Sequence, residues 1–286
     1  MTERVLIVGA GHVGRGLFRA FRSSGLEVLG LHGRRPSAMT TSSGPLPAVA
    51  ADANTLILAV RDDQIDDALG DILDERARGT RARIAPGTVV LHTSGSAEPS
   101  LMPQVTASGM SGGTFHPLVP FANPERAPEL LKRAWIGIDG DDQARATSRR
   151  LAGHIGARTL EIPAGGKSLY HAAAVMSSNF PVVLASIASE LLTSLGIPES
   201  SAQHAVHSLM EGAVSNIADT PPLEALTGPV ARGEAETVLA HLAALRGNAE
   251  ARAVYKRLSL AALDMANRRG AEPGQLGEIQ RALLLR

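Results

Sequence analysis

The pattern of apolar and polar positions predicts that the two halves of the chain are built differently. In the first half, short apolar runs alternate with amphipathic stretches; the runs cover residues 5–8, 27–32, 55–60, 88–91, 113–116, 135–138 and 159–162. Continuous apolar runs of this length are typical of parallel strands that are covered on both faces. The stretches between them, such as 65–73 and 144–154, show helical spacing. This alternation predicts a doubly wound α/β sheet.

The first apolar run leads into a glycine-rich turn, Gly9, Gly11 and Gly14 in the order G-x-G-x-x-G, followed by an amphipathic stretch up to Gly25. A strand, a tight turn and a helix in this order are what a dinucleotide site needs: the first glycine turns the chain, the second admits a pyrophosphate and the third lets the helix pack closely. The phosphates would rest on unpaired N–H groups at the helix start. The alternative is a purely structural glycine turn. The expected cofactor contacts here are Gly9, Ala10, Gly11, His12, Val13 and Gly14.

The end of the second predicted strand bears on which dinucleotide would bind. An acidic residue there would bind the ribose 2′-hydroxyl of NAD, but the chain has His32, Gly33, Arg34 and Arg35. Two guanidinium groups at this place favour the 2′-phosphate of NADP(H), because arginine binds phosphate bidentately. A solvated basic turn is the alternative.

Further cofactor contacts are expected where the next two strands end, because α/β sheets bind ligands at the carboxyl ends of their strands. Val60 and Arg61 follow one strand, and Thr93 and Ser94 follow the next. The polar turn of residues 92–96 either lines the nicotinamide pocket or simply caps the following element.

Beyond residues 163–166 (PAGG) the pattern predicts only helices, over residues 167–195 with an interruption at Pro181, then 200–217, 234–245, 249–268 and 273–284. We therefore expect a Rossmann domain over residues 1–163 and an all-α domain over residues 164–286. The second domain would supply groups for substrate binding and acid–base chemistry.

Composition and charge narrow the classes of function. The chain of 286 residues has 28 basic and 28 acidic side chains, so nothing suggests a nucleic-acid or anionic-membrane partner. The absence of cysteine excludes disulfides, thiolate catalysis and thiolate metal sites. The first apolar run is too short to span a bilayer. We expect a soluble, cytoplasmic protein without a metal site.

The helix predicted after the boundary carries the candidate acid–base groups. At 3.6 residues per turn, Lys167, His171 and Ser178 share one face, with Asn179 beside it. Hydride reduction of a ketone leaves negative charge on oxygen, which an ammonium or imidazolium can stabilise and protonate. Lys167 would be the acid, with its pKa lowered by the helix start, assisted by His171 and Ser178. The alternatives are a solvated lysine and a histidine used in the core or an interface.

Substrate contacts are expected from residues around this helix. Arg232 would pair with a substrate carboxylate through its planar guanidinium, although a surface pair between Arg232 and Glu234 is the alternative. The predicted substrate-binding residues are Ser96, His116, Asn179, Thr227 and Arg232. For His116, a structural turn at the strand end is equally consistent with the sequence.

Several segments together resemble one known group of proteins. The glycine-rich start, the segments LHTSGS and GTFHPL, the helix K-x-x-Y-H-A-A-A-V-M-S-S-N-F and the loop LTGPVARGE are similar to bacterial Rossmann-like proteins with an uncharacterised helical C-terminal domain. This group is related to ketopantoate reductase and pyrroline-5-carboxylate reductase. The resemblance covers nearly the whole chain and implies a C-terminal domain of the 6-phosphogluconate dehydrogenase type. It also implies a homodimer formed through the C-terminal helices.

The resemblance assigns Lys167 to the lysine that begins this helix in ketopantoate reductases and β-hydroxyacid dehydrogenases. At two positions where the relatives have asparagine, this chain has His171 and Val175. We therefore expect NADPH-dependent reduction of a small carboxylated ketone, with 2-dehydropantoate as the first candidate. Reduction of an imine of the pyrroline-5-carboxylate type is the second reading, and a non-catalytic NADP-binding sensor or scaffold is the third.

Overall fold

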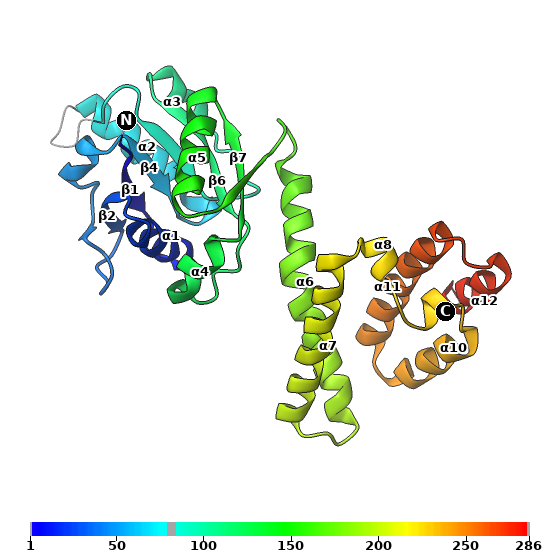
Figure 1. The fold of residues 1–286 in the computed structure, drawn as a ribbon. Helices are drawn as coiled ribbons and strands as arrows, with labels where there is room; N and C mark the ends of the chain where they lie inside the picture. Colours follow the sequence, from blue (N-terminus) through cyan, green and yellow to red (C-terminus); the bar gives the residue numbers. More distant parts are fainter. Residues whose placement is uncertain (1, 79–83, 285–286) are drawn as a thin grey trace. The chain divides into compact units, whose positions relative to one another are not determined.

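A computed structural model of the chain describes residues 2–78 and 84–284. Its first part is an eight-stranded sheet with the order β3-β2-β1-β4-β5-β6-β7-β8 (Figure 1). The strands are β1 Arg4–Val8, β2 Glu27–Gly33, β3 Ser42–Ser43, β4 Thr55–Leu58, β5 Val89–His92, β6 Ser111–Pro117, β7 Trp135–Gly140 and β8 Arg158–Glu161. The strand order reverses at β1, which pairs with both β2 and β4. The doubly wound Rossmann sheet predicted from the sequence is confirmed.

One strand departs from the parallel pattern. β7 runs antiparallel to β6, with Thr114 opposite Asp139 and His116 opposite Gly137. On its other side, β5 pairs with β6 so that His92 lies opposite Thr114. The side chains of His92, Thr114 and Asp139 therefore belong to one row across three strands, which positions the site described below.

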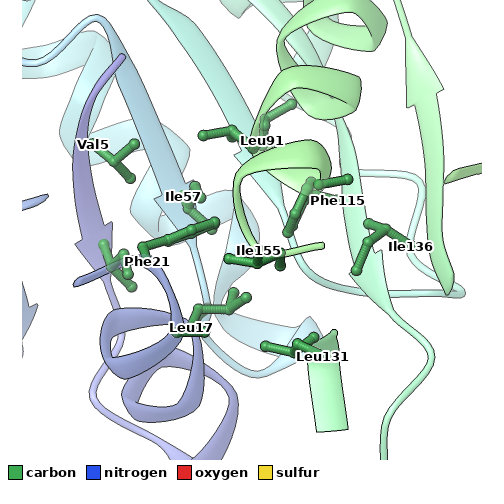
Figure 2. Close-up of a cluster of buried hydrophobic side chains, with 14 of the residues drawn as sticks. Val5, Leu17, Phe21, Ile57, Leu91, Phe115, Leu131, Ile136 and Ile155 are labelled. Carbon is green, nitrogen blue, oxygen red and sulfur yellow. The ribbon is translucent and has the colours of Figure 1, made fainter. Parts of the chain in front are cut away.

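Helices cover both faces of the sheet. α1 (His12–Ser23), α4 (Ala127–Leu131) and α5 (Asp142–His154) share one apolar core with the sheet, and α2 (Ile65–Arg78) and α3 (Met102–Ala107) share the other. Figure 2 shows part of the first core, in which the rings of Phe21 and Phe115 lie 6.1 Å apart. Alternate residues of β1 enter the two cores, Val5 on one side and Leu6 on the other. Burial on both faces explains why the strands are continuously apolar.

Within the described residues, no strand follows β8. The helices beyond it are α6 Lys167–Ser194, α7 Glu199–Asp219, α8 Pro222–Ala225, α9 Pro229–Arg232, α10 Ala235–Ala244, α11 Ala249–Arg268 and α12 Pro273–Leu284. Short 3₁₀ turns occur at Ala48–Asp52, Asp62–Gln64, Pro124–Arg126 and Leu245–Gly247. The interruption predicted at Pro181 does not occur, because α6 continues through this residue at the loss of one backbone hydrogen bond.

The chain divides into two compact units, residues 1–179 and 180–286. The change from strands to helices occurs near the predicted boundary at residue 163, but the first turns of α6 belong to the first unit. They do so because Lys167 and Tyr170 contact β7. In the second unit, α9, α10 and α12 enclose a small core around Val230, Val238 and Ile279.

The helix α6 has a second notable property. It is the one helix of the described residues that is long and apolar enough to cross a membrane, with a mean hydropathy of 1.5. Its window is not buried inside the protein. Length and composition alone do not distinguish a membrane span from a helix whose apolar surface packs against another chain.

Candidate functional site

The glycine-rich turn after β1 has the steric features expected from the sequence. Gly9 has a φ of +116°, and a Cβ there would lie 2.2 Å from the carbonyl oxygen of Ala59. A Cβ on Gly14 would lie 1.8 Å from the carbonyl oxygen of Gly9, so α1 packs directly on the turn. A Cβ on Gly11 would meet no atom within 4 Å. The turn is therefore closed on its inner side and open at Gly11.

The start of α1 offers backbone donors to an anion. Gly11 is the N-cap and contributes no side-chain bond, and the first turn contains no acidic residue. The amide of Arg15 is the one that bonds back to the carbonyl oxygen of Gly11. The N–H groups of residues 12–14 consequently have no partner within the helix, and the helix dipole adds positive potential at the same place.

The basic turn after β2 adjoins this loop. A Cβ on Gly33 would lie 3.4 Å from the Cβ of Ala10, so the residue that precedes Arg34 and Arg35 adjoins the glycine-rich turn. Both arginines are exposed, and neither has an ion-pair partner in the part of the chain that the structure describes. This arrangement suits a phosphate group beside the loop.

The side chain of His32 does not match its predicted role in cofactor binding. It is 5% exposed, Nδ1 bonds to the hydroxyl of Ser42, and Nε2 bonds to the carbonyl oxygen of Gly44. Burial lowers the pKa of the ring. Both ring nitrogens are thus used to hold the segment after β2, and only the carbonyl oxygen of His32 touches the glycine-rich turn, by accepting the N–H of Gly9.

The polar turn after β5 is held by its own hydroxyl groups. Thr93 donates to the carbonyl oxygen of Leu58, and Ser94 accepts the N–H of Ala97. Ser96 donates to Asp62 at 3.0 Å. Arg61, three residues after the end of β4, makes an exposed ion pair with Asp63. These side chains shape the turn around Gly95, which is buried.

Two histidine side chains converge on Gly95, and a tyrosine is bonded to one of them. A Cβ on this glycine would lie 2.7 Å from Cε1 of His116 and 2.8 Å from Nδ1 of His171. The Nδ1 atom of His116 lies 2.8 Å from the hydroxyl of Tyr170, and the rings of His116 and His171 are 5.8 Å apart. His116 is the last residue but one of β6, whereas Tyr170 and His171 are the fourth and fifth residues of α6. We call Gly95, His116, Tyr170 and His171 the imidazole cluster.

The protonation states within the imidazole cluster follow from burial. Desolvation, together with the neighbouring His171, lowers the pKa of His116 to about 4, and burial raises the pKa of Tyr170. At neutral pH, His116 is therefore neutral and Tyr170 keeps its proton. Tyr170 can then donate to Nδ1 of His116, which leaves the imidazole proton on Nε2. The Nδ1 atom of His171 is buried and has no hydrogen-bond partner among the described residues.

Lys167 is the first residue of α6, one turn before the two α6 residues of this cluster. It is 4% exposed, and its ammonium lies 3.0 Å from Asp139, 3.0 Å from the carbonyl oxygen of Ala97 and 3.5 Å from Glu98. The solvated lysine considered from the sequence is therefore wrong. The expected free acid is also not present, because the ammonium is already bonded to a carboxylate. Its main effect is to fasten α6 to β7 and to the turn after β5.

His92 belongs to the row of His92, Thr114 and Asp139 across three strands, and it contacts Lys167. Its Nε2 lies 3.4 Å from the ammonium of Lys167 and 3.1 Å from the hydroxyl of Thr114. Burial, followed by the positive charge of Lys167, lowers the pKa of His92 to about 4. Since an ammonium can only donate, Nε2 accepts and the proton lies on Nδ1, which has no partner among the described residues. A cavity of about 420 Å³ adjoins His92, Asp139 and Lys167.

The remaining predicted residues are not brought into these clusters. Ser178 donates to the carbonyl oxygen of Ala174 and contacts Asn179, and both residues are exposed. Thr227 and Arg232 belong to the second unit. Arg232 is bonded to Glu234 through both Nε, at 2.5 Å, and Nη2, at 3.2 Å. The surface pair considered as an alternative is thus present.

Sequence reasoning missed Asp139 and Tyr170, and it included His92 only as part of the polar turn of residues 92–96. Tyr170 stands directly before His171, and both follow Lys167 within one helical turn, so the spacing itself was a usable signal. No comparable signal marks Asp139, because its place depends on the antiparallel direction of β7. Among the described residues, no group of three or more histidine, aspartate or glutamate side chains is arranged to hold a metal ion.

Comparisons with known proteins agree with this architecture. A family described as a domain of unknown function (DUF2520) matches residues 134–262, and no curated protein matches the sequence. A Bacteroides fragilis protein assigned as an NADP oxidoreductase is 19% identical with a TM-score of 0.70, covering 91% of this chain and 98% of its own. The chain shares its fold.

Two further solved structures extend the likeness. The protein TM1727 from Thermotoga maritima is 23% identical with a TM-score of 0.67, covering 93% of this chain and 99% of its own. The pyrroline carboxylate reductase of Plasmodium falciparum, solved with NADP bound, is 12% identical with a TM-score of 0.61, covering 97% and 98%. At these identities the likeness shows a Rossmann domain followed by a helical region.

Proposed function

We propose that the protein is an NADP(H)-dependent oxidoreductase that reduces the C=N or C=O group of a small molecule. The observation that carries this proposal is the convergence of His116 and His171 on Gly95, with Tyr170 bonded to His116. The cluster lies where β5 and β6 end, which is where open α/β sheets bind their ligands. The same compact unit contains the open glycine-rich turn.

The residues present fit an NADP cofactor. The N–H groups at the start of α1 would hold the pyrophosphate, and the open position at Gly11 leaves room for it. Arg34 and Arg35 would bind the 2′-phosphate, and no carboxylate stands at the end of β2 to favour NAD. When bound, NADPH supplies the hydride for the reduction.

The reduction also needs one proton, which we assign to His171. Its Nδ1 atom makes no hydrogen bond in the described structure and lies against Gly95. His116 is neutral and held by Tyr170, so it adds no competing positive charge to the cluster. Lys167 then acts as a positioning residue, since its ion pair with Asp139 fixes the turn of α6 that precedes His171.

We favour a carboxylated imine over 2-dehydropantoate as the substrate. The case for a ketopantoate-like reaction depended on a free ammonium at Lys167, and this ammonium is bonded to Asp139. The structural likeness to a pyrroline carboxylate reductase, whose substrate is a cyclic imine, also supports this choice.

The assay that tests the proposal follows the loss of NADPH absorbance with 1-pyrroline-5-carboxylate and with 2-dehydropantoate. We expect turnover of the imine, and a fall in kcat of about 10²-fold for His171→Gln at an unchanged Kd for NADPH. His204→Gln, an exposed histidine of α7, is the control and keeps the wild-type rate. Tight NADPH binding without turnover of any ketone or imine would indicate a sensor or scaffold instead. A lack of NADPH binding would contradict the proposed cofactor site itself.

We also propose that the protein forms a homodimer. Large apolar side chains on α6 and α7 are exposed in the single chain, among them Phe180, Val183, Leu209, Val214 and Ile217. A second copy of the chain would cover such a surface. Sedimentation velocity without detergent should give a dimer, whereas a protein soluble only with detergent would support membrane insertion of α6.

A further inference from the structure

A cavity of about 700 Å³ lies within the second unit. Its floor is one face of α11, on which Ala249, Ala253 and Leu260 recur at helical spacing. The 3₁₀ turn before α11 contributes Arg246, and the end of α12 contributes Leu283 and Leu284. α11 and α12 pack against each other within this unit, as Figure 1 shows. The described residues that line the cavity all belong to these three elements.

The charges that line the cavity all have one sign. Arg246, Arg252, Lys256 and Arg257 contribute the polar part of the wall, and none of the described residues that line it is acidic. In the part of the chain that the structure describes, the side chains of Arg246, Arg252 and Arg257 make no hydrogen bond or ion pair. The Nε atom of Arg252 is buried without a partner.

This arrangement is costly unless an anion completes it. Like charges gathered in one concave wall repel each other, and a buried guanidinium N–H without an acceptor loses its hydration. Other arginines of the chain, such as Arg19, Arg149 and Arg232, have carboxylate partners. The three unpartnered arginines of the cavity therefore present unused donors to a ligand. Planar guanidinium groups bind phosphate oxygens in pairs.

We propose that this cavity binds a phosphorylated small molecule of about nucleotide size. The volume is within the range of small-molecule sites and is larger than a single phosphate requires. Three arginines would bind the phosphate oxygens, and the alanine and leucine side chains would contact the apolar part of the ligand. The chain has no net charge, which speaks against an extended nucleic-acid surface. This site lies in residues 180–286 and is independent of the proposed cofactor site.

Isothermal titration calorimetry with inorganic pyrophosphate and with ADP tests the proposal. The pocket variant is Arg252→Gln/Arg257→Gln. The control is Arg133→Gln/Arg268→Gln, which removes the same charge from two exposed arginines outside the cavity. In the pocket variant we expect one class of binding site for these probes to disappear, or its affinity to fall about tenfold or more. The control should bind both probes as the wild type does. ADP should bind this site more tightly than pyrophosphate, since it also contacts the apolar floor.

Three results would overturn the proposal. The first is no binding of either probe to the wild-type protein. The second is an isotherm of the pocket variant that equals that of the wild type. Any binding of the probes would then occur in the first unit. The third is tighter binding of a single-stranded oligonucleotide than of ADP, with the same dependence on Arg252 and Arg257. Circular dichroism of each variant confirms that the helical unit is folded.

Discussion

The ammonium nitrogen of Lys167 lies 3.0 Å from Oδ2 of Asp139, and this pair fastens the first turn of α6 to β7. Asp139 stands opposite Thr114, which in turn stands opposite His92. The lysine therefore spans a row of polar residues that three strands contribute. Three and four residues further along α6, Tyr170 and His171 enter the imidazole cluster. The ion pair thus sets where the proposed proton donor lies.

Removal of Lys167 should destabilise the first unit. Lys167→Met leaves the half-buried Asp139 without its cation, and breaking a buried pair in this way costs about 3 kcal/mol in the free energy of unfolding. Lys167→Met/Asp139→Leu removes both charges and should be more stable than Lys167→Met alone. Urea denaturation measures both values. Equal losses in the single and double variants would contradict a coupled pair.

The parts of the site that are local in sequence could be predicted. The glycine-rich turn was recognisable because strand, turn and helix follow one another within residues 4–23. The Arg232–Glu234 pair was foreseen as an alternative for the same reason, since the two residues are neighbours on one turn. Alternating apolar runs also predicted the sheet, because covering both faces requires apolar residues throughout.

The parts that depend on strand direction could not be predicted. An apolar run does not reveal whether it pairs in parallel or antiparallel, and the antiparallel β7 is what brings Asp139 to His92 and Lys167. Helical spacing placed Lys167 and His171 on one face, but it did not show that their partners come from different strands. The predicted acid was therefore assigned to the residue that the fold uses as an anchor.

Two glycines of the turn after β1 should respond differently to alanine. Gly14→Ala places a Cβ 1.8 Å from a backbone oxygen, so we expect a loss of about 2 kcal/mol in the free energy of unfolding. Gly11→Ala meets no atom and has an ordinary φ of −73°, so its stability should equal that of the wild type. Its Kd for NADP⁺ should rise about tenfold, because the Cβ occupies the path of the pyrophosphate. Unchanged binding would show that the phosphates lie elsewhere.

Stability should decrease as the pH falls from 6.5 to about 4. The pKa of His92 is lowered from 6.5 to about 4 in the folded protein, so over this range the unfolded chain binds more protons than the folded one. Its contribution is complete above pH 6.5 and is lost as the pH falls through the folded pKa, by about 3 kcal/mol in total. The pKa of His116 is also lowered to about 4, so its protonation likewise decreases the stability as the pH falls over this range.

Replacement of one histidine checks this pH dependence. Urea midpoints of His92→Gln, measured between pH 6.5 and about 4, should fall less steeply than those of the wild type. His204→Gln, which removes an exposed histidine, should keep the wild-type slope. A His92→Gln curve parallel to the wild-type curve would mean that His92 is protonated in the folded protein over this range.

The choice between NADP and NAD should depend on Arg34 and Arg35. The two arginines adjoin the glycine-rich turn through Gly33 and Ala10, and a 2′-phosphate is the one group that distinguishes the two cofactors there. Arg34→Gln/Arg35→Gln should weaken NADP⁺ binding about 10- to 100-fold in calorimetric titrations and leave NAD⁺ binding nearly unchanged. Arg126→Gln/Arg133→Gln removes the same charge from the same unit and should change neither affinity. An equal loss for both cofactors would place the arginines on the pyrophosphate, and no loss would mean that they form a solvated turn.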